Sequence, residues 1–387
     1  MKKSSCIRAV VALPVLLSAI GSAHAAEADV TSGLQLKISG FVAFQSTLLV
    51  TDSDHAKIDR NYDFQSGARL FFDIKNTTDS GLTYGARIRF VAANRKDNVI
   101  VDRVYAFLQG GFGTVTLGNG TLSAADFSYI YAHDSRMYER RAFYYGDLLD
   151  NHYFLGGGNF FAIEPTYQSG ISNADTRIKY TSPTIDGFSF GADFTPTAGG
   201  PVYAGNGGRD DLYNHDTLLY ENVVSGGVNY INSFGDVGVR VGGSVTYGSG
   251  VRTADNPAGR DAEIYTFGAQ LSVGNIYTSI NWVRNERIAR AERPLSTVIG
   301  DISYDMGEFL ASVSYAYTWT DGAGSGLDSS YTSGRDLQDN HIAGTSLTYT
   351  LAPGLNAYAE LLYEQQNFRT GRDFETASIG TGLIVGF

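Results

Sequence analysis

Hydrophobic and polar residues alternate along most of the chain, in stretches of about ten residues separated by turns. In residues 34–49 the even positions from Leu36 to Leu48 are mostly apolar, whereas the odd positions include Lys37, Gln45 and Thr47. Because successive side chains of a strand point to opposite faces, this stretch predicts a strand with one apolar and one polar face. The same pattern predicts sixteen strands, over residues 34–49, 60–76, 81–95, 99–109, 112–119, 176–182, 188–196, 222–231, 237–248, 263–273, 276–285, 295–304, 309–318, 341–351, 355–365 and 376–387.

The connections between these strands alternate between short and long from one end of the chain to the other. This asymmetry is typical of outer-membrane barrels, which have short periplasmic turns and longer external loops. A soluble β-sandwich also shows alternating strands, but nothing in a sandwich brings all long loops to one end. We therefore predict an all-β fold, a sixteen-stranded antiparallel transmembrane β-barrel with both termini on the periplasmic side.

The longest connection, residues 121–175, is rich in charged and aromatic side chains. Connections of this length are usually functional or disordered, and disordered segments contain few aromatic residues. We predict that this third external loop folds into the lumen and narrows it. Its acidic side chains include Asp126, Asp134, Glu139, Asp147, Asp150 and Glu164, and the first five of these are the predicted constriction-loop charges.

The first 25 residues have the features of a secretory signal peptide. Lys2, Lys3 and Arg8 precede or open an apolar run of a dozen residues, and Ala23 and Ala25 form a small-x-small cleavage site. The alternative, a buried N-terminal helix, has less support, and the run is too short to span a membrane. We predict cleavage after residue 25 and a single barrel domain over residues 26–387, which would contain no cysteine.

Composition supports an exported barrel and argues against several other classes. The chain has 46 Gly, 25 Tyr and only 8 Pro, a mixture that is unusual for helical or α/β enzymes. Its formal net charge of −11 argues against nucleic acid as a partner. The histidines of the predicted mature chain lack metal-ligand spacing, and the G-x-S-x-G match at residues 187–191 continues into a strand, whereas a nucleophile elbow turns into a helix. No catalytic, cofactor or metal site is predicted.

Several segments together resemble the Gram-negative general porins of the sixteen-stranded, trimeric type. They are LKISG at 36–40, ARL at 68–70, VYAFLQGGFGTVTLGN at 104–119 and the terminal Phe387. The resemblance covers residues 26–387 and implies a homotrimer in the outer membrane of a Gram-negative bacterium, in contact with lipid and lipopolysaccharide. It also implies recognition by the barrel-assembly machinery through Phe387. The loop at 121–175 departs from the family pattern, because it has no Pro-Glu-Phe-Gly.

A basic wall facing the constriction loop is the predicted functional site. Lys37 and Arg69 match wall cations of that family by position, and strand parity adds Arg87, Arg89, Arg103, Arg177 and Lys179. Parity fixes the face but not the depth, so these cations could instead lie at the periplasmic rim. Tyrosines of outward parity, such as Tyr247, Tyr315 and Tyr363, are expected in the interfacial girdles.

These features predict a water-filled channel through which small hydrophilic solutes and ions diffuse passively, because barrels of 16–18 strands leave an aqueous lumen. The alternative is a substrate-specific outer-membrane channel for sugars, phosphate or dicarboxylates. A third hypothesis, a hydrolase embedded in the barrel, requires a Ser–His pair on the outer wall, and the predicted strands supply none.

Overall fold

The computed structural model describes residues 26–30, 33–51, 61–93, 100–120, 127, 171, 175–199, 218–254, 256–289, 291–322, 337–370 and 373–387. The predicted signal peptide and the predicted constriction-loop charges lie outside these residues. The strands are β1 (Ala26–Val30), β2 (Leu34–Thr51), β3 (Tyr62–Thr77), β4 (Thr83–Ala93), β5 (Ile100–Gly110), β6 (Gly113–Asn119), β7 (Thr176–Thr181), β8 (Phe188–Ala198), β9 (Tyr220–Phe234), β10 (Val237–Gly250), β11 (Ala262–Val273), β12 (Ile276–Arg287), β13 (Leu295–Asp305), β14 (Phe309–Thr320), β15 (Leu337–Ala352), β16 (Leu355–Phe368) and β17 (Phe374–Gly386).

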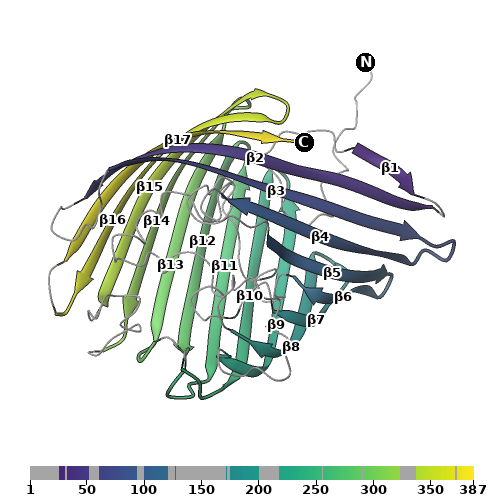
Figure 1. The fold of residues 1–387 in the computed structure, drawn as a ribbon, viewed down its shortest axis with the longest axis horizontal. Helices are drawn as coiled ribbons and strands as arrows, with labels where there is room; N and C mark the ends of the chain where they lie inside the picture. The colour runs from purple at the N-terminus through teal and green to yellow at the C-terminus, as the bar shows by residue number, and fades with distance from the viewer. Residues whose placement is uncertain are drawn as a thin grey trace.

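The strands from β2 to β17 form a closed antiparallel ring. Each pairs with the next strand along the chain, and β17 pairs with β2 to close the ring. The backbone groups of Phe387 and Gly40 exchange two hydrogen bonds, of 2.9 and 3.0 Å, at the periplasmic end of this closing seam. In Figure 1, β2–β4 cross obliquely in front of the long strands β10–β14, as expected for the tilted strands of a barrel.

The sixteen predicted strands all appear in this ring, which confirms the predicted barrel, and most extend a few residues beyond their predicted bounds. The short strand β1 was not predicted. It pairs antiparallel with the first residues of β2, from Ala26 opposite Ile38 to Val30 opposite Leu34. It therefore lies along the same edge of β2 as the end of β17, just beyond Phe387.

Side chains alternate between the two faces of the wall. In β2, Val42 and Phe44 on the outer face are 51% and 47% exposed, whereas Ala43 and Gln45 on the inner face are each 1% exposed. The outer face carries aliphatic and aromatic residues around the whole ring, which suits contact with lipid tails. A small apolar cluster, Phe41, Ala43, Tyr358 and Ile384, lies on the inner face at the closing seam.

The two rims differ as the sequence predicts. Connections such as 235–236 and 274–275 are two residues long, and Gly235 and Gly274 adopt the positive φ angles of 63° and 55° that tight hairpin turns need. The opposite rim carries the longer connections, including 121–175, and is the external one. Within the described part of the chain, no helix has the length and apolarity needed to cross a membrane.

Candidate functional site: an arginine wall inside the barrel

The pairing register brings four predicted wall cations to the inner face of three adjacent strands. Arg69 on β3 lies between Phe41 and Val91, which are inward residues of β2 and β4. On β4, Arg87 lies opposite Asp73, and Arg89 lies opposite Arg103 of β5. We name these four side chains, which come from β3, β4 and β5, the arginine wall: Arg69, Arg87, Arg89 and Arg103.

Arg87 forms the best-defined ion pair of the wall. Its Nε and Nη2 donate to the two carboxylate oxygens of Asp73 at 2.5 and 3.0 Å, a bidentate geometry that fixes the guanidinium plane. The same guanidinium carbon lies 5.5 Å from the ring centroid of Phe71, and that of Arg69 lies 5.8 Å from the ring of Phe41. Two inward aromatic rings therefore support two of the cations by cation–π contact.

Arg89 and Arg103 face each other directly across the β4–β5 pair. Arg89 is 5% exposed, and the register shifts immediately after it, between Arg89 and Phe90. The position of both arginines in the wall therefore concentrates positive charge at one side of the lumen.

The other three predicted cations of this region lie beside the arginine wall. Lys179 of β7 is inward and half-buried, opposite Asp193 of β8. Lys37 is inward and exposed, opposite Asp73. Arg177 is inward but only 2% exposed, and its Nη1 donates to the carbonyl oxygen of Gly120 at 2.6 Å while its Nε donates to Thr195 Oγ1 at 3.2 Å. Arg177 thus holds the backbone at the point where the chain leaves β6.

The opposite side of the ring carries hydroxyl groups and carboxylates. In a sixteen-strand ring, β12 and β13 lie eight strands from β4 and β5. There the inward Asp301 accepts hydrogen bonds from Ser279 Oγ and, at 3.1 Å, from Ser303 Oγ. Further round, the inward Glu360 accepts a 3.2 Å hydrogen bond from Gln45 Nε2 across the closing seam.

Sequence reasoning did not identify these inward carboxylates as part of the lumen. Ile299 shares the inner face with Asp301, and Leu362 shares it with Glu360 and Glu364. Because apolar residues occupy both faces of β13 and β16 there, hydropathy alone does not separate inward from outward positions. The pairing partners are the signal that does, since directly opposed residues share a face.

One residue of the longest connection, Phe127, contacts the inner wall. It is 4% exposed and lies against Gly227 of β9 and Gly242 of β10. Both glycines are inward by register, since Gly227 lies opposite Ser244, and Gly242 opposite Asn229. The chain therefore reaches β9 and β10 only seven residues after Gly120, three and four strands further round the ring than β6.

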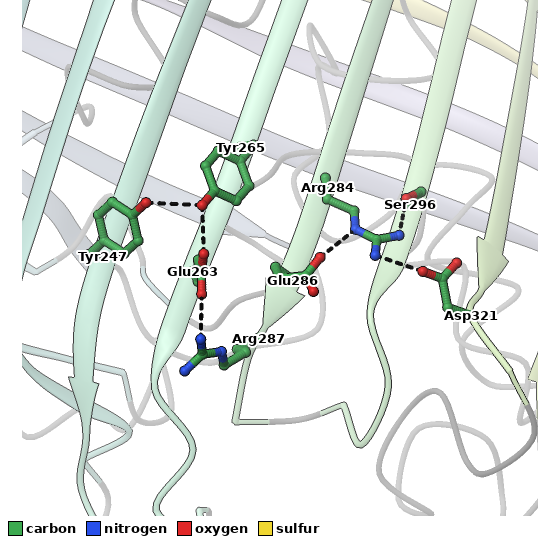
Figure 2. Close-up of polar contacts among 8 residues, drawn as sticks. All are labelled: Tyr247, Glu263, Tyr265, Arg284, Glu286, Arg287, Ser296 and Asp321. Atoms are coloured by element: carbon green, nitrogen blue, oxygen red, sulfur yellow. Dashed lines mark hydrogen bonds and ion pairs between the residues drawn. The ribbon is translucent and has the colours of Figure 1, made fainter.

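The outer face carries a polar belt near the external ends of β10–β14 (Figure 2). Tyr247 and Tyr265 share a 2.9 Å hydrogen bond, Tyr265 donates to Glu263 at 2.5 Å, and Glu263 pairs with Arg287 at 3.1 Å. Beside them Arg284 contacts two carboxylates and a serine, namely Glu286 at 2.8 Å, Asp321 at 2.6 Å and Ser296 at 3.0 Å. The predicted girdle tyrosines Tyr247, Tyr315 and Tyr363 are indeed outward and 48%, 48% and 39% exposed.

Among the described residues, His, Cys, Asp and Glu side chains form no group of three that could hold a metal ion. A closed antiparallel ring of sixteen strands, apolar outside and lined inside with arginines, carboxylates and hydroxyls, defines the class of β-barrel membrane channels.

Comparison with known proteins places the chain within that class. The sequence profile described as "Gram-negative porin" matches residues 9–370. The chain therefore belongs to the Gram-negative porin family and is an outer-membrane channel for passive diffusion. No curated protein sequence matches it.

Solved structures share the fold at low sequence identity. OmpF of Salmonella typhi, in complex with daunomycin, has a TM-score of 0.62 at 13% identity, covering 94% of this chain and 100% of that one. An anion-selective porin from Comamonas acidovorans has a TM-score of 0.59 at 13% identity, covering 92% and 100%. The trimer form of OmpT from Vibrio cholerae has a TM-score of 0.57 at 14% identity, covering 91% and 99%.

Proposed function

We propose that the narrowest part of the channel lies between the arginine wall and the segment 121–175, whose acidic residues Asp126, Asp134, Glu139, Asp147 and Asp150 face it. The observation that carries this proposal is the placement of Arg89 and Arg103 opposite each other inside the ring. The contact of Phe127 with the β9–β10 wall supports an inward course for the segment.

Cations on one side and carboxylates on the other set up a transverse field across the water-filled passage. Dipolar solutes orient in such a field, whereas apolar solutes must give up water to pass. In channels of this kind, selectivity comes from the pore width and from the charges that line it. The protein then acts as a general channel for small hydrophilic solutes and ions.

Reversal potentials in planar bilayers test the role of the arginine wall. Replacing both members of the opposed pair, R89S/R103S, removes two positive charges from the lumen, so ion preference shifts toward cations. Lys75→Ser is the matched control, because Lys75 is also inward but lies near the periplasmic turn after β3. The proposal is contradicted if R89S/R103S shifts the reversal potential no more than Lys75→Ser does.

Conductance in the presence of solutes separates a general from a specific channel. A general channel conducts equally well when sugars, phosphate or dicarboxylates are added at micromolar to millimolar concentration. Concentration-dependent block by one of these solutes would instead identify a substrate-specific channel.

We further propose that the protein assembles as a homotrimer surrounded by lipid and lipopolysaccharide, after recognition of its C-terminal strand by the barrel-assembly machinery. The trimer form of the similar Vibrio cholerae OmpT supports the assembly, and the pairing of Phe387 with Gly40 on the closing seam supports the recognition. Mass measurement of the detergent-solubilised, unheated protein tests the trimer, and a mass of one chain contradicts it.

We also propose that the channel catalyses no reaction. Among the described residues the single histidine is the outward His341, whose Nδ1 contacts the Tyr315 hydroxyl at 2.6 Å and whose Nε2 contacts Asp339 at 3.2 Å. Neither ring nitrogen is left to activate a serine. Phospholipid hydrolysis by purified protein that disappears in His341→Ala would contradict this proposal.

A further inference from the structure

The inner wall of β8–β11 carries a stripe of glycines. Gly191 of β8 lies directly opposite Gly227 of β9, and Gly242 of β10 lies directly opposite Gly268 of β11. A glycine inside a strand weakens it by about 0.5–1 kcal/mol relative to alanine. Such a position often marks the close approach of another backbone.

Phe127 is the group that approaches this stripe. A Cβ placed on Gly227 would lie 3.0 Å from Phe127 Cβ, closer than ordinary packing allows. A Cβ placed on Gly242 would overlap the carbonyl oxygen of Phe127, a backbone atom that a change of rotamer cannot move away. Only glycine at position 242 therefore leaves room for the chain where it lies.

The chain is also held seven residues earlier, at Gly120. The carbonyl oxygen of Gly120 accepts the 2.6 Å hydrogen bond from the buried Arg177 guanidinium described above. Gly120 and Phe127, seven residues apart, thus each contact the barrel wall, Gly120 through Arg177 at the mouth of β6 and Phe127 on the glycines of β9 and β10.

We propose that Gly227 and Gly242 form a seat for Phe127, the glycine seat, and that this seat sets how far the connection that leaves β6 projects into the lumen. Gly227 and Gly242 are then positioning residues for the width of the channel. The effect on channel width rests on the proposed constriction. The proximity of Phe127 to the glycine seat can be tested separately, without any transport measurement.

An engineered disulfide tests the seat. The single cysteine, Cys6, lies in the predicted signal peptide, so F127C/G227C introduces the two thiols of the predicted mature protein. The 3.0 Å between the two Cβ positions needs to lengthen by only about 0.5–1 Å to suit a disulfide. The protein without its predicted signal peptide, refolded or extracted and mildly oxidised, is expected to lose both maleimide-reactive thiols through an intramolecular bond.

The matched control is F127C/G226C. Gly226 is the neighbour of Gly227 on β9, but it faces outward, opposite Val245 and Ala192. Its thiol is therefore on the lipid side of the wall and keeps its reactivity toward maleimide. Equal thiol loss in the two double variants, or none in F127C/G227C, overturns the seat.

A conductance measurement tests what the seat does. In Gly242→Ala the added methyl displaces Phe127 from the wall toward the lumen, so a loss of single-channel conductance and more frequent current fluctuations are expected. Gly226→Ala is the control, because its Cβ meets only Gly191 O, at 3.8 Å. Heat-modifiable mobility on a gel shows that each variant is folded, and a folded Gly242→Ala with unchanged currents overturns the positioning role.

The two readouts separate failure of the seat from failure of the constriction. Absence of the disulfide rejects the seat, whatever the channel conducts. If the disulfide forms but neither Gly242→Ala nor R89S/R103S changes the currents, Phe127 does lie beside Gly227. The proposed constriction and the positioning role are then rejected.

Discussion

Asp73→Asn isolates the electrostatic role of the arginine wall with little change of shape. The carboxylate of Asp73 accepts two hydrogen bonds from Arg87, and it also lies opposite Lys37. An asparagine keeps one acceptor oxygen and the same size, so the guanidinium of Arg87 remains close to its place. The change removes one negative charge from the inner wall and leaves the charge of Arg87 uncompensated.

The expected size of the effect follows from Coulomb's law in a water-filled passage. One unit charge about 6 Å from the path of an ion contributes about 0.7 kcal/mol in water. Screening with a Debye length of about 10 Å at 0.1 M salt leaves about 0.4 kcal/mol. Since about 1.4 kcal/mol corresponds to a factor of ten, anions gain about twofold and cations lose about twofold. The ratio of anion to cation permeability therefore rises about fourfold.

The assay is the zero-current potential of a bilayer separating two concentrations of potassium chloride. The shift toward anions is expected to grow as the salt is diluted, because screening weakens. Asp236→Asn provides the control, since Asp236 lies at the exposed periplasmic turn between β9 and β10. A zero-current potential that moves equally in both variants, or toward cations in Asp73→Asn, refutes the placement of Asp73 and Arg87 beside the ion path.

Three further changes test the wall itself. In Gly382→Ala the new methyl collides with the Tyr358 ring at the closing seam. The free energy of unfolding should therefore fall by about 1–3 kcal/mol, and an unchanged denaturation midpoint contradicts tight packing there. Val313→Arg places a charge on an outward side chain that is 62% exposed, which should cost about 2–4 kcal/mol near the bilayer midplane, as measured by refolding into liposomes. Arg284→Ala removes the cation that pairs with both Glu286 and Asp321 in the outer belt, so the free energy of unfolding should fall by up to about 1 kcal/mol, and added salt should reduce this difference because it is electrostatic.

The ring of strands was predictable because a membrane barrel imposes a period of two on every strand. The outer face must be apolar along the whole bilayer thickness, so the alternation of apolar and polar residues shows which residues of a strand face outward. β1 was not predicted because its few residues lie on the edge of β2 beyond the barrel strands, where no such requirement applies.

Some inward positions are aromatic, and hydropathy alone does not explain these exceptions to the alternation. Phe71 is an inward aromatic because the Arg87 guanidinium lies over its ring. Phe107 is inward because its ring lies over Gly85, the directly opposed residue of β4, where a Cβ would collide with it. These side chains are selected by their neighbours across the sheet, which are far apart in sequence.

The sequence pattern predicts the basic wall, but it does not predict the course of the longest connection. Parity placed Arg69, Arg87, Arg89 and Arg103 on one face, and the register brings them to adjacent strands. Parity could not show that Arg177 is buried on the carbonyl of Gly120, because that contact depends on how the chain leaves β6. A loop without periodicity has no comparable rule, so its course is accessible only through contacts such as that of Phe127.

The closing seam joins β2 to β17, the first and last strands of the ring. No nascent chain can make this pairing before β17 has been synthesised and exported. Until then every partial sheet has two unpaired edges and an uncovered apolar surface, both of which favour aggregation. Pairing between such distant segments is also slow. The cell must therefore keep the whole polypeptide unfolded between translation and insertion, and a chain that stops short of β17 leaves an open sheet.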